Sequence, residues 1–343
     1  MIVYFSTVVR AAPQEKGGEL VKLDWDTKRV LARTPIVPTN PSMLDRNSRG
    51  STRGGRGILV DEDYVYVASY HSILVFDHQL TFVRQISHPL CVDIHEIAWD
   101  GQAIWAASTS IDAAIKIDLQ GKTLDSWWPR EDPVTAAHYN LVPLEIDKEK
   151  DNRTAFVGVG NVAPSHVHLN AMVMQHKRPL VLLNRLGSVI RLYPTEILVN
   201  DPEIEGCHNI LVASDGSILI NTTVGRALHV YSATTGRCVQ RINLLRYWQV
   251  RKLYLRNMPT LIGCWFFRHG RPMRLFHPLF LGAMIARPIF VRGLCETSRH
   301  TFLVGISPAS ILEIDKDSGK LLDMYTYARD RHVCVHGLAH WHR

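Results

Sequence analysis

Six residues suited to metal and anion binding occupy one recurring position in a repeated pattern. Each stands at the start of a short apolar segment that predicts a β-strand. In chain order they are Arg56, His95, His168, His208, Arg292 and His336. Imidazole is the commonest transition-metal ligand in proteins, and guanidinium binds carboxylate, phosphate or sulfate through paired hydrogen bonds. The set therefore predicts a site that combines metal binding with anion binding.

The order of the six residues indicates a division of roles. His95, His168 and His208 lie on consecutive repeats, so we expect them to converge on one metal ion. On the opposite side, Arg56 and Arg292 flank His336 and are expected to clamp an anion. His336 is expected to be either a fourth metal ligand or the acid–base group that faces the substrate. The predicted metal ligands are His95, His168, His208 and His336, and the predicted catalytic residues are His336, Arg56 and Arg292.

The ligand types narrow the choice of metal. None of the six positions holds a carboxylate, which disfavours Ca²⁺ and Mg²⁺ and favours a transition metal. Fe²⁺ is the first expectation, with Zn²⁺ and Cu²⁺ as alternatives, and Ni²⁺ also fits imidazole ligands. Glu96 follows His95 and Glu205 lies shortly before His208. Each is either a hydrogen-bond partner of a ligating imidazole or an exposed turn residue.

A β-propeller is the fold that would position these residues. The segments that begin at the first five of them each contain four short apolar strands, separated by turns such as "SDGS" and "WDGQ". Four antiparallel strands repeated roughly every 40 residues are typical of a propeller blade. The first strand of each blade lines the central axis, so equivalent positions form a ring around one channel. We predict an all-β, six-bladed β-propeller, with a β-sandwich of similar turn spacing as the alternative.

The sixth blade is predicted to combine both ends of the chain. "HGLAHW" from His336 predicts an innermost strand, and "MIVYFSTVV", "GELVKLDWD" and "KRVLART" predict the other three. Pairing of the C-terminal strand with the N-terminal three would remove an open sheet edge. The predicted single domain has blades at approximately 56–93, 94–133, 167–203, 207–244, 290–328, and 333–343 together with 1–34.

Three long inserts are expected to form a lid over the ring, because each joins the outermost strand of one blade to the innermost strand of the next. They span residues 35–55, 134–167 and 245–289. The second contains His138, Tyr139 and His166 as further candidate site residues. The third is basic and aromatic, so it is predicted to attract an anionic substrate. A segment that binds a membrane surface or a protein partner is the alternative.

Composition bounds the partners and the location of the protein. The chain has 343 residues and a net charge of +7, which is concentrated in the third insert, so nucleic acid is not expected as a partner. The six cysteines form no CxxC pair, and no secretory leader or membrane-spanning run is recognised. Reduced, buried thiols and a cytoplasmic location are therefore expected.

Several stretches resemble known propellers. "GILVDEDYVYVASYHSILVFD" is similar to NHL-type and gluconolactonase-like six-bladed propellers. "HVHLNAM", "CHNILVASDG", "FVRGLCETSRHTFLVGISP" and "HGLAHW" more closely resemble a bacterial propeller family of uncharacterised function. The resemblance covers most blades and implies the six-bladed fold, and it supplies no activity.

Three functions remain open at this point. The first is a metal-dependent enzyme, an oxygenase or a lyase in type, that acts on a small anionic substrate in the axial channel. Carotenoid-cleaving oxygenases, which hold iron with four axial histidines, are an analogy at the level of fold. The second is a metal-free group transferase with His336 as nucleophile, by analogy with arylsulfate sulfotransferases. The third is a non-catalytic propeller that binds a partner or a membrane through its basic insert.

Overall fold

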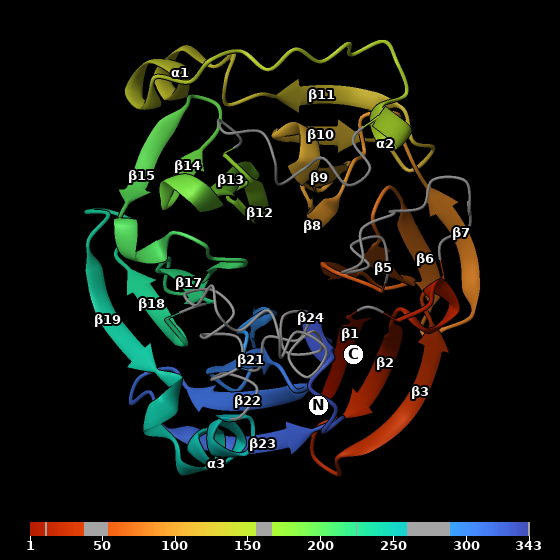
Figure 1. Ribbon diagram of the computed structural model, residues 1–343, viewed down its shortest axis with the longest axis vertical. Coiled ribbons are helices and arrows are strands. Elements are labelled where there is room, and N and C mark those ends of the chain that lie inside the picture. Colours follow the sequence, from red (N-terminus) through yellow and green to blue (C-terminus); the bar gives the residue numbers. More distant parts are fainter. Residues whose placement is uncertain (11, 38–53, 156–166, 224, 259–288, 342–343) are drawn as a thin grey trace, which may run out of the picture.

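The computed structural model describes residues 1–10, 12–37, 54–155, 167–223, 225–258 and 289–341. These segments form six four-stranded antiparallel sheets, arranged as blades around a central axis (Figure 1). The predicted all-β, six-bladed β-propeller is confirmed. Both faces of a blade pack against neighbouring blades, so strands such as Ile104–Ser108 are buried along their whole length, whereas the outer strand Arg29–Pro35 alternates between exposed and half-buried residues.

Five blades are each built from four consecutive strands, ordered from the axis outward. The first contains β4 (Ile58–Val60), β5 (Tyr64–Ala68), β6 (Ile73–Asp77) and β7 (Phe82–Ile86). The second contains β8 (Ile94–Trp99), β9 (Ile104–Ser108), β10 (Ala113–Ile117) and β11 (Thr123–Trp127). The third contains β12 (Leu169–Gln175), β13 (Arg178–Leu183), β14 (Ser188–Arg191) and β15 (Glu196–Asn200). The fourth contains β16 (Ile210–Val212), β17 (Ile218–Thr222), β18 (Ala227–Tyr231) and β19 (Cys238–Asn243). The fifth contains β20 (Leu294–Glu296), β21 (Thr301–Ile306), β22 (Ser310–Asp315) and β23 (Leu321–Thr326).

The sixth blade closes the ring with strands from both ends of the chain. Its order is β24 (Val333–Trp341), β1 (Ile2–Val9), β2 (Glu19–Asp24) and β3 (Arg29–Pro35). β24 is antiparallel to β1, with Ile2 opposite Trp341 and Val9 opposite Val333. The predicted closure is confirmed, and His336 lies within the innermost strand.

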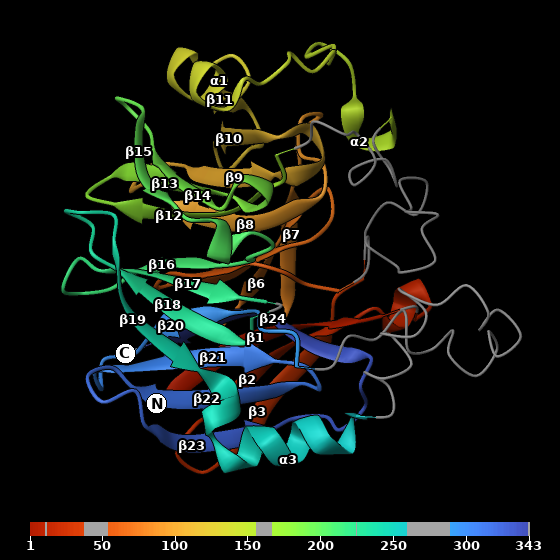
Figure 2. The same cartoon turned by 60° about the vertical axis from the view of Figure 1, so that its left-hand side comes forward.

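The described helices lie at the outer edges of the blades. They are α1 (Pro133–Tyr139), α2 (Asn152–Ala155) and α3 (Trp248–Arg256). Short 3₁₀ turns occur at Gln14–Lys16, Thr109–Ile111, Asn184–Leu186, Pro202–Ile204 and Leu244–Arg246. In both views α1 lies beside β11 and α3 beside β23 (Figure 2). Residues 38–53, 156–166 and 259–288 lie outside the described residues, so the predicted lid stays a prediction, as do its alternatives.

No helix among the described residues is long and apolar enough to cross a membrane.

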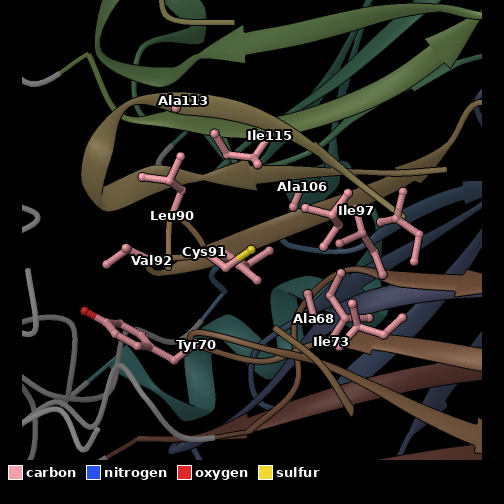
Figure 3. Packing of buried hydrophobic residues seen from close by; sticks show 14 of the residues in the cluster. Ala68, Tyr70, Ile73, Leu90, Cys91, Val92, Ile97, Ala106, Ala113 and Ile115 are labelled. Carbon is pink, nitrogen blue, oxygen red and sulfur yellow. The ribbon is translucent and has the colours of Figure 1, made fainter. Parts of the chain in front are cut away.

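The hydrophobic core is divided among the six contacts between neighbouring blades. Figure 3 shows the cluster between the β4–β7 and β8–β11 blades, where Tyr70 and Ile73 face Cys91, Ile97 and Ile115. Five further clusters of the same kind occupy the other blade contacts. Each fully buried apolar side chain of this size contributes about 1.5–3 kcal/mol. The packed blades therefore hold the six inner strands in fixed positions around the axis.

The described cysteines are free thiols. Cys91, Cys207, Cys295 and Cys334 are buried, and Cys238 is half-buried. Burial raises the pKa of both Cys91 and Cys295 to about 12, so these thiols are protonated at neutral pH. This environment fits the expectation of packing residues rather than nucleophiles.

Candidate anion and metal site at the propeller axis

The four predicted histidines lie together near the starts of the inner strands. The ring centre of His95 is 5.5 Å from that of His168, 6.4 Å from that of His208 and 5.9 Å from that of His336. These residues come from four different blades and meet because equivalent positions of a propeller face one axis. The repeat pattern thus identified residues that are neighbours in space.

Buried polar side chains of the second strands position the ring residues. The Ser6 hydroxyl donates to the Arg56 carbonyl oxygen at 2.6 Å and accepts from the Gly337 amide at 2.9 Å. It therefore joins the segments that carry Arg56 and His336. In the blade of β16–β19, Oδ1 of Asn221 accepts from the backbone N–H of the residue after His208 at 2.9 Å.

Asp112 fixes the backbone at His168. Its buried carboxylate accepts from the amides of Val167, His168 and Leu169 at 2.9, 2.8 and 3.4 Å, and from Nη2 of Arg130 at 3.2 Å. His168 has φ of 58°, a left-handed conformation that costs roughly 1–2 kcal/mol in a non-glycine residue. The position of the His168 imidazole therefore depends on a carboxylate from the preceding blade.

Arg56 belongs to a buried ion pair that sequence analysis missed. Its Nη1 donates to Oδ1 of Asp93 at 2.5 Å and to the Ile94 carbonyl oxygen at 3.0 Å, which uses both hydrogens of that nitrogen. The 3.0 Å contact with Nδ1 of His95 is therefore not a third hydrogen bond. Instead, Nδ1–H of His95 donates to the Asp93 carbonyl oxygen at 2.9 Å, and its Nε2 keeps the lone pair.

The Asp93 carboxylate corrects the sequence-based picture of the clamp. None of the six ring positions holds a carboxylate that could neutralise the arginines. Arg56 is instead paired with an acid from outside these positions, because Asp93 lies two residues before His95 and its carboxylate contacts the guanidinium. Both residues are buried, so the two charges interact mainly with each other rather than with solvent.

Arg292 has a different partner, an imidazole. Its Nη2 donates to Nε2 of His208 at 2.7 Å, and its guanidinium lies 4.6 Å from the centre of the Phe290 ring. Nδ1–H of His208 then donates to the Thr223 hydroxyl at 2.8 Å or the Gly206 carbonyl oxygen at 3.1 Å. The Nε2 lone pair that a metal would need on His208 is thus engaged by Arg292.

His336 is the least satisfied group of the ring. His336 is only 2% exposed, and neither of its ring nitrogens has a hydrogen-bond partner among the described residues. An unpaired buried polar atom costs about 1–3 kcal/mol. Such groups in native proteins commonly mark the place of a water, an ion or a ligand.

The ring holds neutral imidazoles in a positive field. Burial, followed by the ring arginines, holds the pKa of His95, His208 and His336 well below 6.5. The charge of Arg10, at the end of β1, adds to this lowering of the pKa at His95 and His208. Sequence analysis missed Arg10 because it follows a second strand rather than preceding an inner one.

Neither of the two flanking glutamates hydrogen-bonds to a ring imidazole within the described residues. Oε2 of Glu96 instead accepts from Nδ2 of Asn209 at 3.0 Å, and Oε1 lies 3.3 Å from the Ile97 amide. Glu205 ends the 3₁₀ turn at Pro202–Ile204. Of the two alternatives for each glutamate, a hydrogen bond to a ring imidazole is therefore not formed among the described residues.

The candidates from the second insert do not join the ring. α1 places Nε2 of His138 3.4 Å from Nδ2 of Asn200, and the Tyr139 hydroxyl donates to Ser188 at 2.6 Å. Both contacts are to the outer part of the β12–β15 blade. His166 lies outside the described residues.

A more compact set of potential metal ligands lies elsewhere. Among the described residues, ligand atoms of Asp201, Glu203 and His229 lie within 4.8 Å of one another, whereas the ring histidines do not form so compact a group. Glu203 in that set is also paired with Nη2 of Arg241 at 2.8 Å. The described ring is therefore a set of neighbouring imidazoles that would have to move inward to share one ion.

No protein-family model matches the chain, and no curated protein matches its sequence. Among solved structures, a protein of unknown function from Bacteroides caccae is similar over 98% of this chain and 97% of that chain, with 10% identity and a TM-score of 0.56. A chain of a nidogen/laminin complex is similar over the same shares, with 9% identity and a TM-score of 0.57. These likenesses establish the fold, and the first agrees with the resemblance to a bacterial propeller family of uncharacterised function.

Proposed function

We propose that the chain is a metal-dependent enzyme, an oxygenase or a lyase in type, that acts on a small anionic substrate at the axial ring. The unpaired, buried imidazole of His336 is the observation that carries this proposal. A ligand bound in the ring would supply the hydrogen-bond or coordination partner that His336 lacks among the described residues.

The positive field supports an anion as that ligand. Burial and then the charges of Arg292 and Arg56 lower the pKa of His336, so the ring disfavours a further proton. An anion is stabilised by the same charges, and each charge-assisted hydrogen bond is worth roughly 1.5–3 kcal/mol. An anion that accepts the Arg292 N–H would also release Nε2 of His208. Anion binding and metal coordination at His208 are coupled in this proposal.

The histidine geometry supports a transition metal. Nδ1–H of His95 bonds to a backbone carbonyl oxygen while Nε2 keeps its lone pair, which is how proteins commonly orient a metal-binding imidazole. Two imidazoles bound at about 2.1 Å to one ion have ring centres roughly 5 Å apart. The ring centres of His168 and His336 lie 5.5 and 5.9 Å from that of His95, so each of these two pairs comes within about 1 Å of that value.

These considerations refine the ligand set. We assign His95, His168 and His336 as the first ligands, with His208 joining when Arg292 transfers its hydrogen bond to the substrate. Fe²⁺ is the first choice of ion and Zn²⁺ or Cu²⁺ the alternatives, because the ligands are neutral imidazoles. If His336 stays unligated, its neutral imidazole is suited to take a proton from the substrate.

Elemental analysis of protein purified without an affinity tag or a chelator tests the metal. We expect about one transition ion per chain, with sharp loss in His95→Gln, His168→Gln and His336→Gln and a smaller loss in His208→Gln. His138→Gln, on the outer helix α1, is the control and should keep the metal. Equal metal content in the wild type and a triple ring variant would remove the metal from the proposal.

The Arg292–His208 contact favours one second candidate, a metal-free group transferase. In that case the ring binds only the anion, and the neutral His336 attacks the transferable group. A metal-free protein that binds sulfate, and that becomes covalently modified at His336 by an activated sulfate or phosphate ester, would support this candidate over the first.

A further inference from the structure

A cavity of about 270 Å³ lies on the axis next to the ring and is lined by residues of all six inner strands. Most of its walls are apolar. They include Leu59, Trp99, Met172, Met174, Leu211 and Leu338. The polar exceptions are Glu96 and Asn209, which directly follow the ring residues His95 and His208.

The Glu96 carboxyl is held in a defined orientation at this cavity. Oδ1 of Asn209 accepts from Nδ2 of Asn221 and from the Gly293 amide, both at 2.9 Å, which identifies the other amide atom as a donor. That Nδ2 donates to Oε2 of Glu96 at 3.0 Å. The remaining oxygen, Oε1, has a longer contact of 3.3 Å with the Ile97 amide.

Gly57 gives the carboxyl its space. A Cβ atom at residue 57 would lie 1.8 Å from Oε1 of Glu96, so any larger residue there would displace the carboxyl. Because Gly57 and Asn209 belong to segments of different blades, the Glu96 side chain reaches across part of the axis. Glu96 is half-buried as a residue, and it is the one titratable side chain among the described residues that line the cavity.

Glu96 has no cationic partner among the described ion pairs, and the same is true of the buried Glu313, which accepts hydrogen bonds from Trp25 and Thr301 instead. Asp93, Asp112 and Glu296 each face an Arg or Lys nitrogen, at 2.5, 3.2 and 2.8 Å. Carboxylates removed from water are normally paired with a cation. A cationic ligand would supply that partner.

We propose that this axial cavity binds a small organic ammonium ion, with its N–H groups on Glu96 and its apolar body against the walls. An engineered cavity of 150 Å³ in another protein holds benzene, so the volume here fits a molecule of roughly ten non-hydrogen atoms. Trp99 adds an aromatic face, which favours a cation. The site is separate from the proposed reaction at the ring and does not depend on it.

Calorimetric titration with matched probes tests the proposal. The probes are 2-phenylethylammonium and 2-phenylethanol, which have the same shape and differ in charge. The titration is carried out at pH 9, where the ammonium is still charged. We expect the wild type to bind the ammonium in preference to the alcohol, and Glu96→Gln to weaken ammonium binding roughly 10- to 100-fold. Glu62→Gln, in an exposed turn, is the control and should leave binding unchanged.

Three results would overturn the proposal. They are equal affinity for the ammonium and the alcohol, ammonium binding that Glu96→Gln does not change, and no binding by the folded wild type. If Glu96→Gln fails to fold, Leu211→Trp, which fills the cavity and keeps the carboxyl, should abolish ammonium binding. Metal content and sulfate binding, measured on the same variants, should stay at wild-type levels, which separates failure of this site from failure of the ring.

Discussion

Arg56 and Arg292 occupy equivalent positions in two blades, yet their surroundings differ. Arg56 forms a buried ion pair with Asp93, a residue of the neighbouring β8–β11 blade. Arg292 instead donates to Nε2 of His208 and lies against Phe290. The repeat therefore determines where a side chain stands, while its non-repeated neighbours determine what it does. We expect Arg56 to contribute mainly to stability and Arg292 mainly to ligand binding.

Removal of residues 334–343 would have the largest effect, because these residues form most of β24, the strand that carries His336 between the two arginines. β1 would lose its inner partner along Ile2 to Val8. We expect insoluble protein, measured as the soluble fraction after expression. A truncated chain that stays soluble and melts at the wild-type temperature would contradict the role assigned to the closing strand.

Acidification should destabilise the metal-free protein through both sides of the ring. His95, His208 and His336 have pKa values well below 6.5 when folded, so below pH 6.5 the unfolded chain binds protons that the folded chain does not. The free energy of unfolding should fall by up to about 1.4 kcal/mol per pH unit for each histidine. Urea unfolding between pH 6.5 and 4.5 measures it. His95→Gln and His208→Gln should each reduce the slope, and a flat wild-type profile would exclude this effect.

Asp93→Asn should reduce stability strongly, because it leaves the buried charge of Arg56 without its counter-charge. Breaking one partner of a buried ion pair costs about 3–5 kcal/mol. Urea unfolding at pH 7 measures the change, with Asp61→Asn in an exposed turn as the control. A cost below 1 kcal/mol would show that Arg56 does not depend on Asp93, and the contrast between the two arginines would weaken.

The smallest expected effect is the difference in sulfate affinity between variants of Arg292 and Arg56. Arg292→Lys keeps the charge and loses the planar fork, so sulfate affinity should fall roughly 10- to 100-fold. Arg56→Lys should lower stability. It should change sulfate affinity less than about 3-fold, because Arg56 is paired with Asp93 and acts on the anion only through its charge. Calorimetric titration gives both affinities. Equal losses in the two variants would mean that the two sides of the ring act alike.

The fold was predictable because propeller information is local and repeated. Short apolar runs in the inner strands, alternation in some outer strands, and turns such as "SDGS" indicate the strands from their own residues. Closure was also predictable, since "HGLAHW" had the pattern of an inner strand and the N-terminal segments supplied three strands. The described parts of the inserts were less predictable, because α1 and α3 pack on outer strands through contacts that have no repeat.

The ring residues were predictable for the same reason, and their partners were not. Register alone aligned the four histidines and two arginines. The partner of Arg56 was missed because Asp93 occurs in one blade only. His208 was assigned as a metal ligand from its ring position alone, because its bond to Arg292 joins residues 84 positions apart and could not be foreseen. The Glu96–Asn209 bond was missed for the same reason, since it joins residues 113 positions apart. Such pairs depend on the angle between blades, which one sequence does not encode locally.

The bond between Ser6 and the Gly337 amide joins residues 331 positions apart, and it lies beside His336. During synthesis at roughly 5–20 residues per second, β1 therefore waits about 15–65 s for its inner partner. Five blades can collapse while the chain is still on the ribosome, but the last imidazole of the ring arrives only with β24. A chain interrupted before β24 would thus have most of its hydrophobic core, but its axial ring would lack His336. The hydrogen bond that closes the fold and the complete ring of six residues therefore form only after β24 has been synthesised.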